Sequence, residues 1–315
     1  MTTASDGSGQ TSENGRAQRL IDRARLIRAL RDFLDQRGLI EVQTPVITAS
    51  GVTDVHIESL RLADDLGYLR TSPEYAHKRL LVEGIGDLYE LGPVFRAEEA
   101  GRMHRVEFTL LEWYRRNGDW RTLAQELLDL CQFALVTVGR NRRTERWRDW
   151  SACFTEADLP DPLAASNADI RSITSDLPAD CDRDMRLDWL FSTRIQAHFP
   201  ENALTLVHGY PASQAALAQL DSRDPRKAQR FELFAGPIEL ANGYQELTDW
   251  KEQLARFEGD KQKRRDLGRK EMPVDQLFIE ALKIGLPACA GVALGVDRLA
   301  MVALQSSDIA QVRTF

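Results

Sequence analysis

The chain has 315 residues, 43% of them hydrophobic, which is enough for one large buried core. It lacks an uninterrupted apolar run of the roughly 18–20 residues that a membrane helix requires, so we expect a soluble protein. Its net charge of −7 lowers the expectation that a nucleic acid is its main partner, because phosphate contacts favour a basic surface.

Residues 1–16 are polar and rich in Gly and Ser, which is typical of a disordered tail. We therefore predict one folded domain over residues 17–315. The N-terminus has neither the charged start nor the apolar stretch of a secretory signal. The cysteines are scattered without a CxxC pair, which indicates reduced, packed thiols in the cytoplasm and neither disulfides nor a zinc site. They are Cys131, Cys153, Cys181 and Cys289.

Helices are predicted where apolar residues recur at steps of three and four, and strands where they alternate. The first helix covers residues 19–37, and a short strand follows over 39–42. A second helix begins at Ser72-Pro73-Glu74, where Ser suits the cap and Pro the first helical position. The later elements are strands 88–96 and 106–114, a helix 121–137, a weakly patterned stretch 140–205, strand-like residues 231–247, helices 250–266 and 274–284, a strand with a glycine turn 291–295, and a helix 296–304.

Strands 88–96 and 106–114 predict an antiparallel hairpin with a long charged connection. Glu112 shares a face of the second strand with Phe108 and Tyr114, which suits a pocket wall better than simple packing. There is no regular βαβ alternation, and no GxGxxG joins a strand to a helix. We therefore predict an α+β fold, with a mainly antiparallel β-sheet flanked by helices.

Three separated segments match the three motifs of class II aminoacyl-tRNA synthetases. The helix 19–37 leading to Pro45 resembles motif 1, the dimer-forming element. Phe95-Arg96-Ala97-Glu98, followed by His104, Glu107 and Phe108, resembles motif 2, and the segment 291–299 resembles motif 3. The stretches TSPEY, EFTLLEWY, RFELF, ELANGYQELTD and LGVDRL are similar to lysyl-tRNA synthetases. They are more similar still to a truncated branch of that family, the elongation factor P–(R)-β-lysine ligases, over residues of about 19 to 304.

The resemblance implies a class II catalytic core that binds ATP. Forming an aminoacyl-adenylate brings a carboxylate to the α-phosphate, so the site must supply fixed positive charge. Arg96 would hold the α-phosphate and Arg298 the γ-phosphate as the catalytic residues, and Phe108 would stack the adenine against Arg298. Glu98 would read the adenine amino group. The other residues expected at ATP are Ala97, Arg102, His104, Arg105, Glu239, Leu240 and Gly295. The alternative for either arginine is an ordinary surface salt bridge.

The resemblance also places Glu239 and Glu246 on Mg²⁺ at the ATP phosphates, although two solvated strand carboxylates would give the same pattern. A cationic amino acid requires carboxylates in a partly apolar pocket. The expected substrate-binding residues are Ser72, Pro73, Glu74, Glu112, Tyr114, Asn242, Glu246 and Ala293. Helix capping is the alternative for Ser72 and Glu74, and packing or turn formation the alternative for Asn242.

Three basic features leave alternatives open. Arg105 stands where the relatives have Asn, so it either adds charge at the phosphates or points to solvent. Residues 140–148 form either a solvated loop or a docking segment for a partner. Residues 261–270 form either an exposed helix end or a surface for an acidic partner.

These expectations combine into one function. Only a short polar segment precedes the first helix, so we expect no anticodon-reading OB-fold and no tRNA partner. We predict ATP-dependent activation of (R)-β-lysine, or lysine, and its transfer to the ε-amine of a lysine on elongation factor P. The enzyme would be a cytoplasmic homodimer joined by its first helix, without membrane contact. The alternatives are lysyl transfer to tRNA or another amine, and a catalytically inactive regulatory paralogue.

Overall fold

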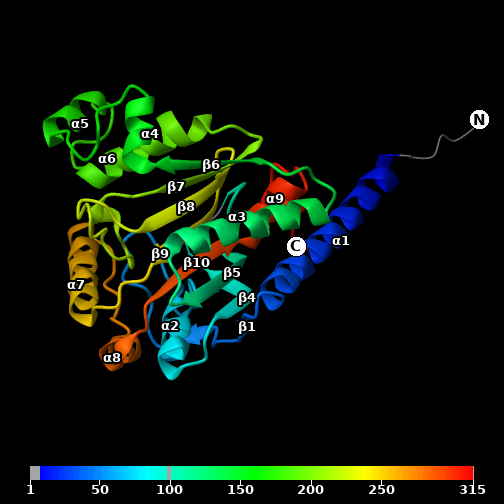
Figure 1. Cartoon of the computed structure of the whole chain (residues 1–315), viewed down its shortest axis with the longest axis horizontal. Helices are drawn as coiled ribbons and strands as arrows, with labels where there is room; N and C mark the ends of the chain where they lie inside the picture. Colours follow the sequence, from blue (N-terminus) through cyan, green and yellow to red (C-terminus); the bar gives the residue numbers. More distant parts are fainter. Residues whose placement is uncertain (1–7, 98–100, 315) are drawn as a thin grey trace, which may run out of the picture.

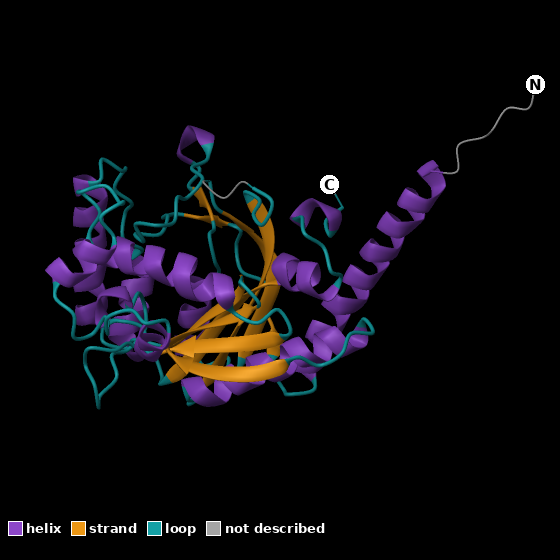
Figure 2. Ribbon diagram, turned by 90° about the horizontal axis from the view of Figure 1, so that it is seen from above, coloured by secondary structure: helices purple, strands orange, loops and turns teal. Residues whose placement is uncertain are grey.

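The computed structural model describes residues 8–97 and 101–314, and Figures 1 and 2 show how its helices and strands are arranged. The strands are β1 (Ile40–Glu41), β2 (Ile47–Thr48), β3 (Tyr68–Leu69), β4 (Leu88–Phe95), β5 (Glu107–Arg116), β6 (Thr144–Asp149), β7 (Ala203–His208), β8 (Arg230–Ala235), β9 (Ile238–Gln245) and β10 (Cys289–Gly295). The α-helices are α1 (Ser8–Asp35), α2 (Glu74–Glu83), α3 (Trp120–Thr137), α4 (Trp150–Glu156), α5 (Asn167–Ile173), α6 (Arg183–Leu190), α7 (Trp250–Asp266), α8 (Gln276–Gly285) and α9 (Val296–Ala303).

An eight-stranded sheet with the order β1-β4-β5-β10-β9-β8-β7-β6 forms the centre of the fold. The pairs from β4 to β7 in that order are antiparallel, and only the two edge pairs, β1 with β4 and β6 with β7, are parallel. The predicted α+β class and the mainly antiparallel sheet are therefore confirmed.

The hairpin of β4 and β5 has the predicted pairing, with Leu88 opposite Tyr114 and Glu90 opposite Glu112. On the other side of β5, β10 places Gly291 opposite Tyr114 and Ala293 opposite Glu112. The three strands that carry the motif 2 and motif 3 residues thus lie side by side at the middle of the sheet.

Helices α1, α3 and α9 cover one face of this sheet, as Figure 1 shows, and their apolar side chains build the largest core cluster. Helix α3 begins where the Asp119 side chain accepts a hydrogen bond from the Arg121 backbone N–H, a standard N-cap. Leu127, Leu128 and Leu130 of α3 are fully buried against the strands. This layer holds the sheet rigid behind the other face.

Two separate helical groups cover the opposite face. Helices α2, α7 and α8 pack with β5 and β10 in one cluster. Helices α4 to α6 pack around Trp150, Phe154 and Phe191 against β7 and β8 in another. The weakly patterned stretch 140–205 therefore contains an edge strand and three short helices. In the described part of the chain, no helix is long and apolar enough to cross a bilayer.

Three elements differ from the sequence prediction. Helix α1 begins at Ser8, so residues 8–16 of the expected disordered tail continue the helix that the apolar residues after position 19 stabilise. Residues 231–247 form two strands joined by a turn at Gly236. Arg264, in the basic run 261–270, is fully buried, because it bonds to Glu58 and to the backbone carbonyls of Asp54 and Lys270.

Candidate active site

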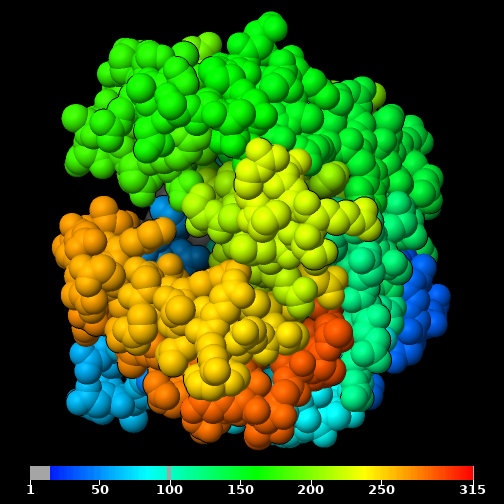
Figure 3. Space-filling view, turned by 60° about the vertical axis from the view of Figure 1, so that its left-hand side comes forward, coloured from blue at the N-terminus to red at the C-terminus, as the bar shows by residue number. Residues whose placement is uncertain are grey.

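A cavity of about 790 Å³ lies on the second face of the sheet, between α2, α7 and the segment 180–196. Figure 3 shows its mouth as a hollow between the green segments around α4 to α6 and the orange helix α7. Fifteen of the predicted site residues line it: Ser72, Glu74, Arg96, His104, Arg105, Phe108, Glu112, Tyr114, Glu239, Leu240, Asn242, Glu246, Ala293, Gly295 and Arg298.

Three of the predicted residues lie elsewhere. Pro73 precedes α2 and does not reach the cavity wall, and the Ala97 N–H donates to the Glu58 carbonyl. Arg102 extends toward the C-terminal segment, where its Nη2 donates to the Ser307 carbonyl at 3.3 Å. The predicted contacts of Arg102 and Ala97 side chains with ATP are therefore not supported by the geometry. Glu98 lies outside the described residues.

One end of the cavity, which we call the basic end, is formed by Arg96, His104 and Arg298. The Arg298 Nη1 donates to the Glu239 carbonyl at 3.1 Å, and its Nη2 lies 2.6 Å from His104 Nε2. Arg96 lies with its guanidinium carbon 5.1 Å from the centre of the Phe108 ring. Two guanidinium groups and an aromatic face therefore lie at one end of the cavity, an arrangement that suits an anionic ligand with an aromatic ring.

Arg105 braces the loop between β4 and β5. Its Nη1 donates to the carbonyls of Gly101 and His104, and its Nη2 lies 3.5 Å from an Asp308 carboxylate oxygen. Arg105 neither points to solvent nor offers all its N–H groups to a phosphate. Its side chain lines the cavity, but its N–H groups bond to the loop itself.

The predicted binding of Mg²⁺ at the ATP phosphates by Glu239 and Glu246 stays a prediction. Glu246 lies seven positions after Glu239 and forms an ion pair with Lys78 at 2.6 Å. The carboxylate that interacts with Glu239 is Glu232, on the neighbouring strand β8. A register shift at Leu233 and Phe234 brings both to the cavity wall.

Glu232 and Glu239 are two carboxylates at the basic end, and Mg²⁺ is commonly held by one or two carboxylates together with substrate phosphates. Both oxygens of Glu232 already have donors, with Tyr210 at 2.6 Å and Arg230 at 2.5 Å. Among the described residues, however, no three His, Cys, Asp or Glu side chains form a complete protein cage for a metal.

The opposite end of the cavity, which we call the acidic end, carries Glu74, Glu112 and Glu246. Ser72 donates to Glu112 at 2.6 Å and the Tyr114 hydroxyl donates to it at 2.8 Å. Burial raises the pKa of the Glu112 carboxyl, and so does the nearby Glu74 charge, whereas His77 and the two hydroxyl donors oppose the rise. Burial likewise raises the pKa of Glu246 to about 8. Clustered buried carboxylates of this kind favour a cationic ligand.

The two ends lie along β10. Gly291 is opposite Tyr114 and beside Glu246, whereas Gly295 adjoins Arg298. Four residues of strand span roughly 13 Å, which is the separation of the two ends along β10. Between them, Asn242 is opposite Ala293, and its buried Oδ1 has no hydrogen-bond partner, so the amide is available to a ligand.

Gly291→Ala tests the close packing at the acidic end. A Cβ at this position would overlap the Tyr114 ring and the Glu246 carboxylate. We expect the substitution to raise the KM for the amino acid by roughly 10-fold or more and to destabilise the fold by about 1–3 kcal/mol. Amino-acid-dependent ATP–pyrophosphate exchange and thermal melting measure the two effects.

The control is Gly259→Ala, on helix α7, where an added Cβ has no neighbour within 4 Å. This change should leave the KM unaltered and stabilise the helix by up to about 1 kcal/mol. Equal exchange kinetics in the two variants would show that the acidic end does not depend on Gly291.

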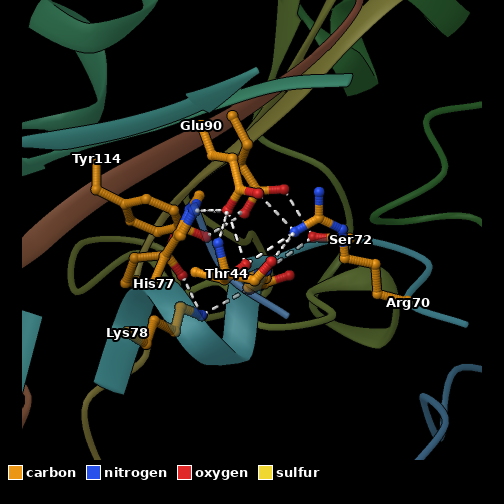
Figure 4. Close-up of polar contacts among 10 residues, drawn as sticks. Thr44, Arg70, Ser72, His77, Lys78, Glu90 and Tyr114 are labelled. Atoms are coloured by element: carbon orange, nitrogen blue, oxygen red, sulfur yellow. Dashed lines mark hydrogen bonds and ion pairs between the residues drawn. The ribbon is translucent and has the colours of Figure 1, made fainter. Parts of the chain in front are cut away.

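A buried polar network lies behind the acidic end (Figure 4). Glu90 is 2% exposed and accepts hydrogen bonds from Thr44 at 2.7 Å and Arg70 at 2.6 Å, and it lies 3.1 Å from His77 Nε2. Although burial opposes ionisation, these partners lower the pKa of Glu90 to about 2. His77 Nδ1 in turn lies 3.8 Å from Glu112, so the network supports the cavity wall.

The depressed pKa of Glu90 predicts how stability depends on pH. Its contribution is present above the ordinary value of 4.5 and is lost as the pH falls toward about 2, because the unfolded chain binds the proton first. We expect Glu90→Gln to lower the free energy of unfolding at pH 7 by about 2–3 kcal/mol. The same variant should lose less stability than the wild type between pH 4.5 and 2.

Denaturant unfolding of the wild type, Glu90→Gln and Glu83→Gln across this pH range checks the prediction. Glu83 is an exposed residue on α2 and should behave like the wild type. Parallel pH curves for all three proteins would contradict the proposed role of the network.

Lys78 at the acidic end and Glu232 at the basic end were not predicted from the sequence, and neither was the network around Glu90. Lys78 is fully buried, and its Nζ lies 2.6 Å from a carboxylate oxygen of Glu74 and 2.6 Å from one of Glu246. Lys78 follows Glu74 by four residues on a predicted helix, and this spacing alone could have predicted their ion pair. Glu232 belongs to the RFELF stretch that contributed to the family resemblance, but no role was assigned to it.

Comparisons with known proteins agree with this geometry. The family model for class II tRNA synthetases (D, K and N) matches residues 10–315. The chain is 42% identical over 308 residues to an elongation factor P–(R)-β-lysine ligase of Mannheimia succiniciproducens, with 94% of each chain covered. It is 43% identical over 310 residues to the ligase of that name from Yersinia enterocolitica, again with 94% of each covered. The corresponding protein of Vibrio vulnificus is 41% identical over 313 residues, with 95% of each covered.

The match extends over nearly the whole chain and includes every strand around the cavity. The protein therefore belongs to the class II tRNA synthetase family and, within it, to the group of the elongation factor P–(R)-β-lysine ligases.

Proposed function

We propose that the chain activates (R)-β-lysine, or lysine, with ATP and transfers the acyl group to the ε-amine of a lysine on elongation factor P. One observation carries the proposal: a single cavity joins a basic end with Arg96 and Arg298 to an acidic end with Glu112 and Glu246. The names of the relatives supply the amino acid and the acceptor.

The reaction has two steps. First, a carboxylate oxygen of the amino acid attacks the α-phosphorus of ATP, and the bond to pyrophosphate breaks. Arg96 and Arg298 would stabilise the charge that gathers on the phosphates. Second, the neutral amine of the acceptor attacks the acyl carbon, the bond to AMP breaks, and the amine loses a proton. The acidic end would hold the ammonium groups of the amino acid throughout.

Mg²⁺ would be held by Glu232 and Glu239 together with the ATP phosphates, and would supply charge neutralisation between them. In this proposal, Glu246 binds the amino acid, because it lies at the acidic end near Glu74 and Glu112. Ser72, Tyr114 and Asn242 would orient the substrate.

The wider setting is also a proposal. We infer a homodimer that forms through α1 and the adjoining α3, since Ile21, Phe133 and Val136 expose apolar side chains there. Sedimentation of the full chain tests this, and a monomer at micromolar concentration would refute it. We place the enzyme in the cytoplasm, where an acceptor that takes part in translation is found.

ATP–pyrophosphate exchange tests the first step directly. Exchange should depend on (R)-β-lysine or lysine and be absent with leucine, glutamate and arginine. Exchange with none of the amino acids would favour an inactive regulatory paralogue. A transfer assay that offers elongation factor P and tRNA side by side then identifies the acceptor, and label on tRNA would favour the synthetase alternative.

A further inference from the structure

Lys78 is a buried cation with no direct access to the cavity. Its side chain is fully buried on α2, behind the wall that Glu74 and Glu246 form. The Nζ lies 2.6 Å from each of these carboxylates and 5.6 Å from the centre of the Phe278 ring on α8. Figure 4 shows Lys78 below the network of Glu90 and His77. A charge in this position cannot touch the substrate, but it contacts two groups that can.

The pairing fixes the positions of both carboxylates. Glu74 comes from α2, and Glu246 comes from the end of β9, so Lys78 joins two elements that are remote in sequence. Without a cation, two buried carboxylates would repel each other, and one would take up a proton. The pKa of Lys78 is raised by Glu246 and Glu74, although burial opposes this, so the ammonium form persists at neutral pH.

The number of charged groups at the acidic end determines which charge on the ligand is favoured. Glu74, Glu112 and Glu246 bring three carboxylates to the acidic end, and Lys78 compensates one of them. With all three carboxylates ionised, the remaining negative charge matches the two ammonium groups of a diamino acid. An amino acid with a single ammonium group would leave a buried carboxylate without a compensating cation, which is costly.

We propose that Lys78 is a positioning residue that holds Glu74 and Glu246 at the cavity wall and sets the charge of the acidic end, so that the pocket selects amino acids with two ammonium groups. This inference rests on the proposed activation of lysine or (R)-β-lysine, and it assigns the basis of that selectivity to a residue outside the cavity.

Lys78→Met removes the charge and keeps an unbranched side chain. We expect the KM for lysine at pH 7.5 to rise by roughly 10- to 100-fold, with a smaller change in kcat. Without Lys78, Glu74 and Glu246 are no longer held in place, and displaced carboxyl groups discriminate less between an ammonium group and a hydroxyl. The preference for lysine over 6-hydroxynorleucine, which has one ammonium group fewer, should therefore fall at least about 10-fold in kcat/KM.

The selectivity separates this role from simple packing. A loss of packing alone would raise the KM for lysine and for 6-hydroxynorleucine alike. The loss of the Lys78 ion pairs with Glu74 and Glu246 should instead change the ratio of the two kcat/KM values.

Two further variants complete the experiment. Lys283→Met removes an exposed lysine on α8 that pairs with Glu280, and it should match the wild type. The double variant Lys78→Met/Glu74→Gln removes one positive and one negative charge. It should bind lysine weakly but keep the preference over 6-hydroxynorleucine within about threefold of the wild type. If circular dichroism shows that Lys78→Met alone does not fold, the selectivity of the double variant tests the proposal instead.

ATP–pyrophosphate exchange with lysine, (R)-β-lysine and 6-hydroxynorleucine measures all of these effects. A wild type that shows no exchange with lysine or with (R)-β-lysine would overturn the proposed function as well. An active wild type with unchanged KM and selectivity in a folded Lys78→Met, or lost selectivity in the double variant, would overturn the role of Lys78 alone.

Discussion

Arg298→Ala should reduce kcat for amino-acid-dependent ATP–pyrophosphate exchange by roughly 10²- to 10³-fold, the usual cost of removing one fixed charge-stabilising donor. Arg298 donates to the Glu239 carbonyl and to His104, so it both borders the basic end and holds the hairpin loop against β9. The loss should appear in kcat and in the KM for ATP, while the KM for the amino acid changes little, because the acidic end is roughly 13 Å away.

Arg298→Lys distinguishes the two parts of this role. A lysine keeps the charge but cannot stack its planar group on a base or donate two parallel hydrogen bonds, so we expect an intermediate loss. Arg265→Ala, which removes an exposed arginine paired with Glu271, is the control and should retain wild-type kinetics. Exchange by Arg298→Ala at the wild-type rate would remove Arg298 from the catalytic group.

Asp297→Ala should destabilise the fold by about 3–4 kcal/mol, which is the typical cost of breaking a buried charged network. Asp297 is 1% exposed and accepts hydrogen bonds from the Thr109 N–H at 2.9 Å, from Arg23 at 2.7 Å and from Arg313 at 3.1 Å. One carboxylate thus joins α1, β5, α9 and the C-terminal segment. Its removal leaves two partly buried guanidinium groups without this partner.

Thermal melting and denaturant unfolding measure this loss, with an expected decrease in Tm of roughly 6–16 °C. Glu280→Ala removes an exposed carboxylate that pairs with Lys283 and should change stability by less than about 1 kcal/mol. A Tm within 2 °C of the wild type for Asp297→Ala would show that the network contributes less than about 1 kcal/mol, since that amount corresponds to about 2–4 °C.

The motif residues could be predicted because short-range patterns determine them. The alternation of Phe108, Glu112 and Tyr114 indicates one face of a strand, and β5 places all three on the cavity wall. The same reasoning could not assign different roles to Glu239 and Glu246. The residue type and the position in the family motif do not give the distance between the two carboxylates.

Other parts of the site depend on contacts between elements that are remote in sequence. The partner of Glu239 is Glu232, and a strand register shift brings them together. Lys78 meets Glu246 only because α2 packs beside the end of β9. Residues 140–205 show little periodicity, since their helices are short and bury few side chains each, such as Ile170 on α5. Tertiary packing determines these features, and the local propensities of the residues do not predict that packing.

A co-crystal structure with a non-hydrolysable lysyl-adenylate analogue would test the central claim most directly, namely that one cavity binds the nucleotide at its basic end and the diamino acid at its acidic end. We predict the adenine between Phe108 and Arg298, the phosphate mimic beside Arg96, and the ε-ammonium within hydrogen-bond distance of Glu246. An analogue bound in the reverse direction, or outside this cavity, would contradict the account.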